Sequence, residues 1–404
     1  MDGVDLKAEA QREVERITPL LTGTSDWMAD NPEIGLQEFQ AAERLTGLLE
    51  TCGAAVERGI AGMPTAFLAR LPGSNPGPRV AIIAEYDALP EVGHGCGHNI
   101  IATAALGAGL ALARLGQAGA LPGSVVVIGT PAEESVVENA GGKVPILEQG
   151  YFEGVDAAIM VHPWTEDAIM LRSTLVAHGL EVSFHGQAAH AAANPHEGRN
   201  ALDALVVMFS SIGLLRQQFR PDARIHGIIT NGGAAPNVIP ALTAARLRVR
   251  AADAGYAREL VGRVVACAEA GAAATGTRME WREYMWPYLN LLPNRSLGAA
   301  FAANLVQLGR RMLLHEGLDM VGSTDLGNVS HCVPAVAALL KICDKEAGWH
   351  NHAVAAATRT AAGHKAIVDG AIGLAMTTLD VLLDANLRER AHRDHMDQVE
   401  GRST

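Results

Sequence analysis

The sequence predicts an α/β fold in which a mostly parallel sheet lies between helices, with a smaller α+β domain inserted into the chain. Three observations support this prediction. Short apolar runs rich in β-branched residues alternate with longer helical segments, as in strands buried on both faces of a parallel sheet. Between residues 176 and 288 the order changes to strand, helix, strand, strand, helix, strand. The chain of 404 residues is also longer than one hydrophobic core usually serves.

The first domain is predicted to comprise residues 1–175 and 289–404. It begins with helical spacing of apolar residues at 6–20 and 41–52, interrupted by a turn at 30–32. Four runs are predicted to form its buried strands, at 79–87, 124–134, 156–163 and 336–343.

Two further segments of this domain stand out by composition: one is mostly apolar and the other is rich in charged residues. Residues 99–113 are apolar, contain two glycines and are shorter than the roughly 20 residues that cross a bilayer, so we expect a buried helix. The charged C-terminal segment 388–404 is expected to fray.

The inserted domain is predicted at residues 176–288. An alternating strand at its start is followed by a long helical segment at 201–219. Two strands joined through a turn at 235–240, a second helix and a final strand complete it. This order is typical of a two-layer α+β domain with an antiparallel sheet.

The composition is that of a folded globular protein, with 49% hydrophobic and 19% charged residues. A net charge of −12 disfavours binding to the phosphate backbone of nucleic acid. The five cysteines are scattered without the spacing of a disulfide framework, and the N-terminus lacks the apolar region of a signal peptide. We therefore expect a cytoplasmic protein with neither a nucleic-acid nor a membrane partner.

Potential metal ligands follow each of the four predicted strands of the first domain. In an open α/β sheet such groups converge beyond the carboxyl ends of the strands. Imidazole and thiolate suit zinc and related ions, and carboxylates can bridge two ions. The residues are Asp87, Cys96 and His98 after the first run, Glu133 and Glu134 after the second, His162 at the third, and Asp344, His350 and His352 after the fourth.

Each of these features alone also has a structural interpretation. Residues 94–98 are compatible with a glycine-rich turn before a helix, and adjacent glutamates commonly begin a solvated helix. His162 alone would be a histidine that ends a strand. Because the features meet at four strand ends, we favour a metal site in which one glutamate stays free. Chemistry alone does not choose between His350 and His352.

A two-metal site with a free carboxylate predicts hydrolysis of an amide. Water is acidified there by the cations, and the carboxylate takes its proton and returns it to the leaving nitrogen. The alternative, Cys96 acting as a nucleophile beside a histidine, leaves the glutamate pair and His162 without a role. The sequence contains no nucleophile-elbow serine, P-loop or dinucleotide-binding glycine pattern.

Several motifs along nearly the whole chain resemble metallopeptidase family 20, especially the amidohydrolase branch that contains p-aminobenzoyl-glutamate, hippurate and indole-3-acetyl-amino acid hydrolases. Besides the strand end at His162, they are NPEIGLQEF (31–39), EYDALPEVGHGCGHN (85–99), TPAEES (130–135), HGQAAHAAANPHEGRNALDA (185–204), NVIP (237–240), GSTDLGNVS (322–330) and GHK (363–365). The resemblance implies a catalytic domain that binds metal and an inserted domain that serves as a lid and for dimerisation.

The resemblance also implies roles for the residues at the family's positions. The general base falls on Glu133, and Asp87 resembles a carboxylate that orients a ligand imidazole. The metal ligands fall on Cys96, His98, Glu134, His162 and His350. One or two divalent ions per subunit are expected: the branch often uses manganese, whereas a thiolate ligand favours zinc.

In the inserted domain, the resemblance implies residues that contact the substrate. His190 stands where the family has a histidine that reaches the active site of the partner subunit and polarises the scissile carbonyl. Asn237 resembles a residue that holds a substrate carboxylate or carbonyl, with Arg250 assisting. A homodimer formed through this domain is therefore expected.

Two positions depart from the family pattern. Asn328 replaces a second aspartate, and the surroundings of His350 differ from the usual Gly-His-Ser. We expect a metal-dependent amidohydrolase for N-acyl or N-aroyl amino acids or related small amides. The alternatives are hydrolysis of another carbon–nitrogen bond, as in a deaminase for an aromatic amine or amidine-like substrate, and a non-catalytic binding protein.

Overall fold

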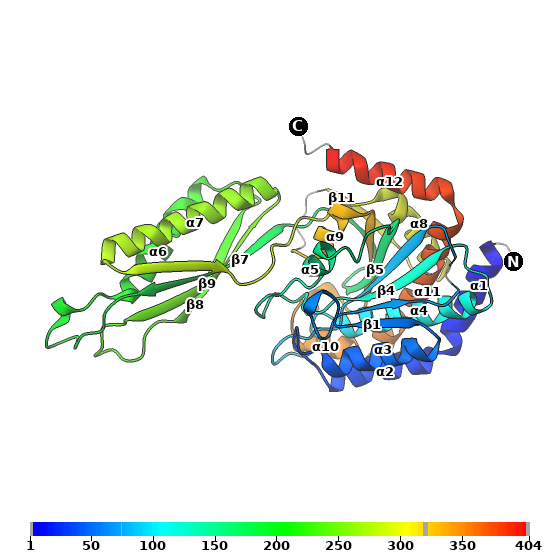
Figure 1. The fold of residues 1–404 in the computed structure, drawn as a ribbon, viewed down its shortest axis with the longest axis horizontal. Coiled ribbons are helices and arrows are strands. Elements are labelled where there is room, and N and C mark those ends of the chain that lie inside the picture. Colours follow the sequence, from blue (N-terminus) through cyan, green and yellow to red (C-terminus); the bar gives the residue numbers. More distant parts are fainter. Residues whose placement is uncertain (1–2, 74, 318–321, 401–404) are drawn as a thin grey trace. The chain divides into compact units, whose positions relative to one another are not determined.

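The computed structural model describes residues 3–73, 75–317 and 322–400 and divides into two compact units. Figure 1 shows each of them. The first unit contains the described parts of residues 1–173, 291–319 and 324–404. The second contains residues 174–290 together with Gly322 and Ser323. The sequence-based estimate of 176–288 lies just inside these bounds.

An eight-stranded sheet forms the centre of the first unit, in the order β1-β2-β4-β3-β5-β12-β6-β11. The inner pairs β3–β4, β3–β5 and β5–β12 are parallel, whereas β1–β2 and β2–β4 are antiparallel. The strands are β1 (Ala55–Arg58), β2 (Phe67–Arg70), β3 (Arg79–Ala84), β4 (Ser124–Gly129), β5 (Ala157–Trp164), β6 (Ala168–Arg172), β11 (Leu313–Gly317) and β12 (Ala335–Lys341). The predicted α/β fold with a mostly parallel sheet is confirmed.

Two apolar layers cover the sheet, one on each face. In β3, Val80 and Ile82 belong to one layer, and Ala81 and Ile83 belong to the other, because successive side chains of a strand point to opposite faces. The first layer is built from α1 (Gly3–Arg16), α2 (Thr18–Asp30), α3 (Phe39–Thr51), α4 (His98–Gln117), α8 (Arg295–Gln307), α11 (Ala361–Leu383) and α12 (Ala385–Glu400). The second includes α5 (Lys143–Glu148) and α9 (Leu326–Cys332).

Helix α4 packs against α11 through small residues. A Cβ added at Gly107 would lie 2.8 Å from the Cβ of Ala371, so the two backbones approach too closely for a larger residue. Both helices are long and apolar enough to cross a membrane, but 94% and 83% of their apolar windows are buried within the unit. They are core helices, as predicted for residues 99–113.

The second unit is a two-layer α+β domain. Its antiparallel sheet has the order β10-β7-β9-β8, and α6 and α7 pack on one face of it. The elements are β7 (Val176–His185), α6 (Ala201–Leu215), β8 (Arg224–Asn231), β9 (Leu242–Ala251), α7 (Ala254–Thr275) and β10 (Arg278–Glu283). The predicted element order is confirmed.

The prediction of a frayed tail is wrong for residues 388–400, whereas 401–404 lie outside the described residues. These residues belong to helix α12, whose Leu387 and Ala391 are buried in the first apolar layer. The carboxylate of Asp394 accepts a hydrogen bond from the backbone N–H of Ser296 at 2.7 Å. The helix is mostly charged and has only a narrow apolar stripe, so its sequence does not indicate a packed helix. Packing of this stripe against α8 stabilises it.

Candidate metal centre

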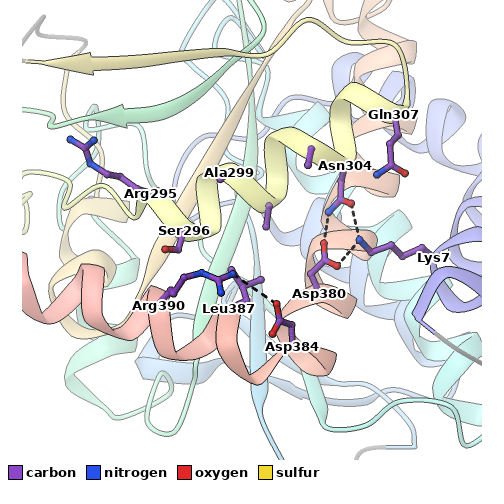
Figure 2. A pocket seen from close by; sticks show the side chains of 12 residues that line it. Lys7, Arg295, Ser296, Ala299, Asn304, Gln307, Asp380, Asp384, Leu387 and Arg390 are labelled. Carbon is purple, nitrogen blue, oxygen red and sulfur yellow. Dashed lines mark hydrogen bonds and ion pairs between the residues drawn. The ribbon is translucent and has the colours of Figure 1, made fainter.

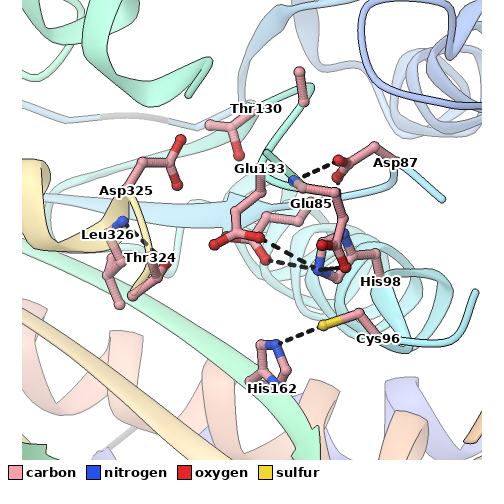
Figure 3. Close-up of polar contacts among 12 residues, drawn as sticks. Glu85, Asp87, Cys96, His98, Thr130, Glu133, His162, Thr324, Asp325 and Leu326 are labelled. Carbon is pink, nitrogen blue, oxygen red and sulfur yellow. Dashed lines mark hydrogen bonds and ion pairs between the residues drawn. The ribbon is translucent and has the colours of Figure 1, made fainter. Parts of the chain in front are cut away.

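The candidate site lies at the carboxyl ends of β3, β4 and β5, where Figure 3 shows the side chains that meet there. The ligand atoms fall into groups whose members all lie within 4.8 Å of one another. These groups are Cys96–His98–His162, Cys96–Glu134–His350 and His98–Glu133–Glu134. The structure therefore brings together all five predicted ligands and the predicted base, although β3, β4 and β5 are separated along the chain by helices and loops.

Asp87 positions two of the predicted ligands, His98 and Glu134. Its Oδ1 lies 2.7 Å from Nδ1 of His98, and its Oδ2 accepts the backbone N–H of Glu134 at 2.8 Å. A carboxylate on Nδ1 places the proton there and leaves Nε2 of His98 as a lone-pair donor toward the cluster. The same carboxylate therefore sets the tautomer of one predicted ligand and the backbone position of another.

Two atoms in the cluster are buried without a hydrogen bond. They are Nε2 of His98 and Oε1 of Glu134, which lie 4.0 Å apart. Buried polar atoms in folded proteins are nearly always paired, and a site for an ion is one of the few explanations for an exception. The two atoms, together with the sulfur of Cys96, form a donor set that fits a zinc or manganese ion.

His162 and Cys96 face each other across this set. The Nε2 of His162 lies 3.6 Å from the sulfur of Cys96, and its Nδ1 is 2.7 Å from the carbonyl oxygen of Pro163, to which it donates. The indole N–H of Trp349 donates to the same sulfur at 3.3 Å. A donor to a sulfur stabilises the thiolate form, which is the form that binds a metal.

His350 is placed by a strained backbone. Its φ is 60°, a value that residues other than glycine rarely adopt, and its N–H donates to the carbonyl of Gly95 at 3.2 Å. Its Nε2 lies 3.5 Å from Oε1 of Glu134. Both His350 and His352 are exposed, but His352 begins helix α10 (His352–Ala357) and belongs to none of the ligand groups found among the described residues.

The electrostatics of the cluster favour a bound cation. Burial raises the pKa of the Cys96 thiol and of Glu134 above their ordinary values, and it lowers the pKa of His162 to about 4. With no cation the thiol would hold its proton and the histidine would be neutral. A divalent cation among these groups would favour the thiolate and carboxylate forms and use the neutral imidazole.

Glu133 points into the cluster beside a second group of carboxylates. Its Oε2 is 3.9 Å from Nε2 of His98, and it also groups with Glu85 and Asp325. Burial, followed by the charges of Glu85, Asp325 and Glu134, raises the pKa of Glu133 well above its ordinary value. A carboxylate with a raised pKa is suited to accept and return a proton near neutral pH.

Sequence reasoning missed Lys143. This lysine is fully buried, and its ammonium donates to Glu85 at 2.6 Å and also to Asp325. Although burial acts to raise the pKa of Glu85, the charges of Lys143 and His98 hold that pKa below its ordinary value. Asp325 lay within the 322–330 motif, but nothing in the sequence pattern around Lys143 identifies it as a partner of residues 58 and 182 positions away.

The three predicted substrate residues lie in the second unit. His190 and Asn237 are exposed on adjacent loops, joined by the bond from the Ala191 N–H to the Asn237 carbonyl at 3.0 Å. The Nδ1 of His190 accepts backbone N–H groups of Ala192 and Ala193, so Nε2 carries the proton of the neutral ring. His190 thus presents a donor to solvent.

Arg250 is half-buried on β9, paired in the sheet with Ala177 on β7 and Arg224 on β8. The catalytic roles of His190, Asn237 and Arg250 stay predictions.

A further cavity lies elsewhere in the first unit, among α8, α11 and α12, and has a volume of about 510 Å³. Figure 2 shows that three of its polar side chains, Lys7, Asn304 and Asp380, face one another. Lys7 bonds to Asn304 at 3.0 Å and to Asp380 at 2.5 Å. None of the predicted site residues lines this cavity.

Comparison with known families identifies the chain. The model of Peptidase family M20/M25/M40 matches residues 81–367, which span all of the candidate ligands. The chain belongs to this family. The resemblance inferred from the motifs is confirmed, and membership makes the chain a hydrolase that acts on carbon–nitrogen bonds.

Relatives within the family have different substrates in their names. The mouse Xaa-Arg dipeptidase is 36% identical, over 96% of this chain and 92% of its own length. One of the subunits of p-aminobenzoyl-glutamate hydrolase from Escherichia coli is 28% identical, over 93% of this chain and 91% of its own. A dinuclear metal-binding M20 peptidase from Bacillus subtilis shares the fold, with a TM-score of 0.61, 21% identity, and coverage of 91% of this chain and 99% of its own.

Proposed function

We propose that this protein is a metal-dependent amidohydrolase that cleaves the amide bond of a dipeptide or an N-acyl or N-aroyl amino acid. The observation that carries the proposal is the convergence of five ligand side chains beside a further carboxylate, Glu133. The two buried atoms at the centre that lack a hydrogen bond, on His98 and Glu134, support a cation there.

The proposed ligands are the residues of the first two groups, Cys96, His98, Glu134, His162 and His350. A bound divalent cation supplies Lewis acidity, which polarises a carbonyl and makes water more acidic. The thiolate favours zinc, while the carboxylate and imidazole ligands also suit manganese. Asp87 holds His98 in the tautomer that can bind the ion.

Glu133 moves the proton in the proposed reaction. It takes a proton from the attacking water and returns it to the nitrogen of the leaving amine, so the carboxylate is regenerated in each turnover. Its burial near other carboxylates supports this role, because their charges favour the protonated form that the second step requires.

Two substrate classes follow from the relatives. We propose dipeptides with a C-terminal arginine or similar basic residue as the first choice, because the 36% identical relative extends over 96% of the chain. Aroyl-glutamates are the second choice, from the 28% identical relative. In either case we expect Asn237 and Arg250 to hold the substrate carboxylate, and the Nε2–H of His190 to polarise the scissile carbonyl in the partner subunit of a homodimer.

The test is to remove metal from the purified protein with a chelator and to supply manganese or zinc separately. Each form is assayed with a panel of Xaa-Arg dipeptides, N-acyl amino acids and p-aminobenzoyl-glutamate. We expect hydrolysis to vanish with the metal and to return with at least one of the ions, releasing a carboxylic acid and an amine in equal amounts. Full activity of the metal-free protein, or release of ammonia alone, would overturn the proposal.

A further inference from the structure

The sequence motif at residues 31–39 supplies no ligand to the candidate metal cluster, but it packs against the turn that precedes Glu133. A Cβ added at Gly35 would come within 2.8 Å of the Cβ of Ala132 and 2.9 Å of its Cα. Ala132 immediately precedes Glu133 and Glu134. The motif therefore touches the backbone that presents the proposed base and one proposed ligand.

Ala132 has an unusual conformation. Its φ is 55°, in the left-handed region that residues with a Cβ rarely adopt. Such a conformation persists only where surrounding structure holds it, and these sites cluster at functional positions. The turn at Ala132 thus needs a support outside itself.

Glu38 supplies that support. Its side chain is fully buried, Oε1 accepts the backbone N–H of Ala132 at 2.9 Å, and Oε2 accepts the hydroxyl of Thr65 at 2.8 Å. From the other side, Asp87 accepts the N–H of Glu134 at 2.8 Å. Two acidic side chains, Glu38 and Asp87, therefore hold the backbone on either side of Glu133.

We propose that Glu38 is a positioning residue of the active site, which holds the strained Ala132 turn so that Glu133 and Glu134 face the metal cluster. This rests on the proposed function for the roles of the two glutamates. Without the carboxylate oxygen, the N–H of Ala132 would be buried without an acceptor, and the turn would relax toward negative φ. Both glutamate side chains would then move from the positions that the cluster requires.

The test compares Glu38→Ala with Glu38→Gln. We expect Glu38→Ala to lower kcat and metal affinity about 10–100-fold, as removal of groups that orient metal ligands does elsewhere, with KM nearly unchanged. Glu38→Gln keeps an oxygen for the Ala132 N–H and should stay within a few-fold of the wild type. Thermal unfolding of each variant reports whether the fold is retained.

Glu33 offers a matched control within the same motif. Its carboxylate accepts the N–H of Ala41 at 2.9 Å, at the start of α3, and its other hydrogen-bond partner among the described residues is Gln40. We expect Glu33→Ala to keep its kcat and its metal affinity. Equal losses in Glu33→Ala and Glu38→Ala would show a general effect of the segment and overturn the proposal.

A rescue variant distinguishes loss of support for the strained backbone of Ala132 from a general loss of structure in Glu38→Ala. Ala132→Gly relieves the need for external support, because glycine adopts positive φ without strain. The double variant Glu38→Ala/Ala132→Gly should recover part of the lost metal affinity and kcat. No recovery, or unchanged metal affinity in Glu38→Ala, would overturn the role of Glu38. Metal affinity is measured by titration without substrate, so this outcome is distinct from a failure to find any hydrolysed amide.

Discussion

At the scale of single residues, the site consists of buried polar side chains that lack a hydrogen bond or have a shifted pKa. The Nε2 of His98 is buried without a hydrogen bond, and the thiol of Cys96 and the carboxyl of Glu134 have raised pKa values. A folded protein retains such groups where they serve a function, because each costs stability if it stays uncompensated. A cation would compensate all three at once.

The role of Glu133 predicts that Glu133→Gln abolishes turnover while the metal stays bound. Glutamine has the same shape but cannot take a proton from water, so kcat should fall about 10²–10⁴-fold. The measurements are steady-state kinetics on a hydrolysed amide and metal content by elemental analysis. Near wild-type kcat in this variant would remove Glu133 from the mechanism.

Glu38 predicts a pH dependence of stability that is separate from activity. Burial and the neighbouring charge of Asp87 raise its pKa from an ordinary 4.5 to about 8, and the phenol of Tyr86 also faces it. The folded state keeps this proton up to about pH 8, whereas the unfolded state loses it near 4.5. Rising pH therefore favours unfolding across that window.

The measurement is urea unfolding of the wild type and Glu38→Gln at several pH values across the window. The variant lacks this proton, so its advantage in free energy of unfolding should grow between about pH 4.5 and 8 and then level off. Parallel curves for the two proteins would contradict the raised pKa.

At the scale of elements, the sheet and its loops bring charges together that must be balanced inside the protein. Glu85 follows β3, Asp325 precedes α9, and Lys143 begins α5. The lysine joins these three elements on the face of the sheet that carries the second apolar layer. A buried lysine is tolerated there because two carboxylates compensate it.

Lys143→Met is therefore expected to destabilise the fold. It leaves two buried carboxylates without their cation, and loss of one partner from a buried ion pair costs about 3–5 kcal/mol. The change in free energy of unfolding is measured by urea denaturation at neutral pH. Lys365→Met is a control, since Lys365 is largely exposed and its pair with Asp369 should contribute only about 0–1 kcal/mol. Similar losses in both variants would refute the argument.

At the scale of the whole molecule, the chain contains a unit with the candidate metal centre and a second unit that carries His190 and Asn237. The second unit exposes apolar side chains on α6 and β8, at Val206, Leu214, Ile228 and Ile229. Apolar side chains that gather in one exposed patch mark an interaction surface. The proposal that two copies associate through this unit predicts that these side chains lie in such a patch.

If His190 acts on the partner subunit, two inactive variants should complement each other. His190→Ala and Glu133→Gln homodimers would each lack one component in every site. A mixed dimer made by co-expression would contain one site with both components intact, so activity should return well above that of either variant. Light scattering checks the dimer. Mixed dimers as inactive as the parents would show that His190 does not act across the interface.

The elements that the sequence predicted well are those with a strong periodic pattern. The runs at 79–87, 124–134 and 156–163 became β3, β4 and β5, because continuous β-branched runs are stable only between two apolar layers. The short strand β2, Phe67–Arg70, went unpredicted, since four residues without a β-branched side chain carry little pattern. Its strand identity comes from pairing with β4.

By itself, the sequence determined the fold class, the family and the residues of the candidate metal cluster. The reason is that side chains which follow buried parallel strands lie at the same edge of the sheet. Only the tertiary structure decided which charges meet. Glu38 reaches Ala132 across 94 positions, and Lys143 reaches Asp325 across 182. Pairs of residues so far apart in the chain produce no periodic pattern in the sequence. They depend on how separate segments pack, and packing is a property of the folded whole.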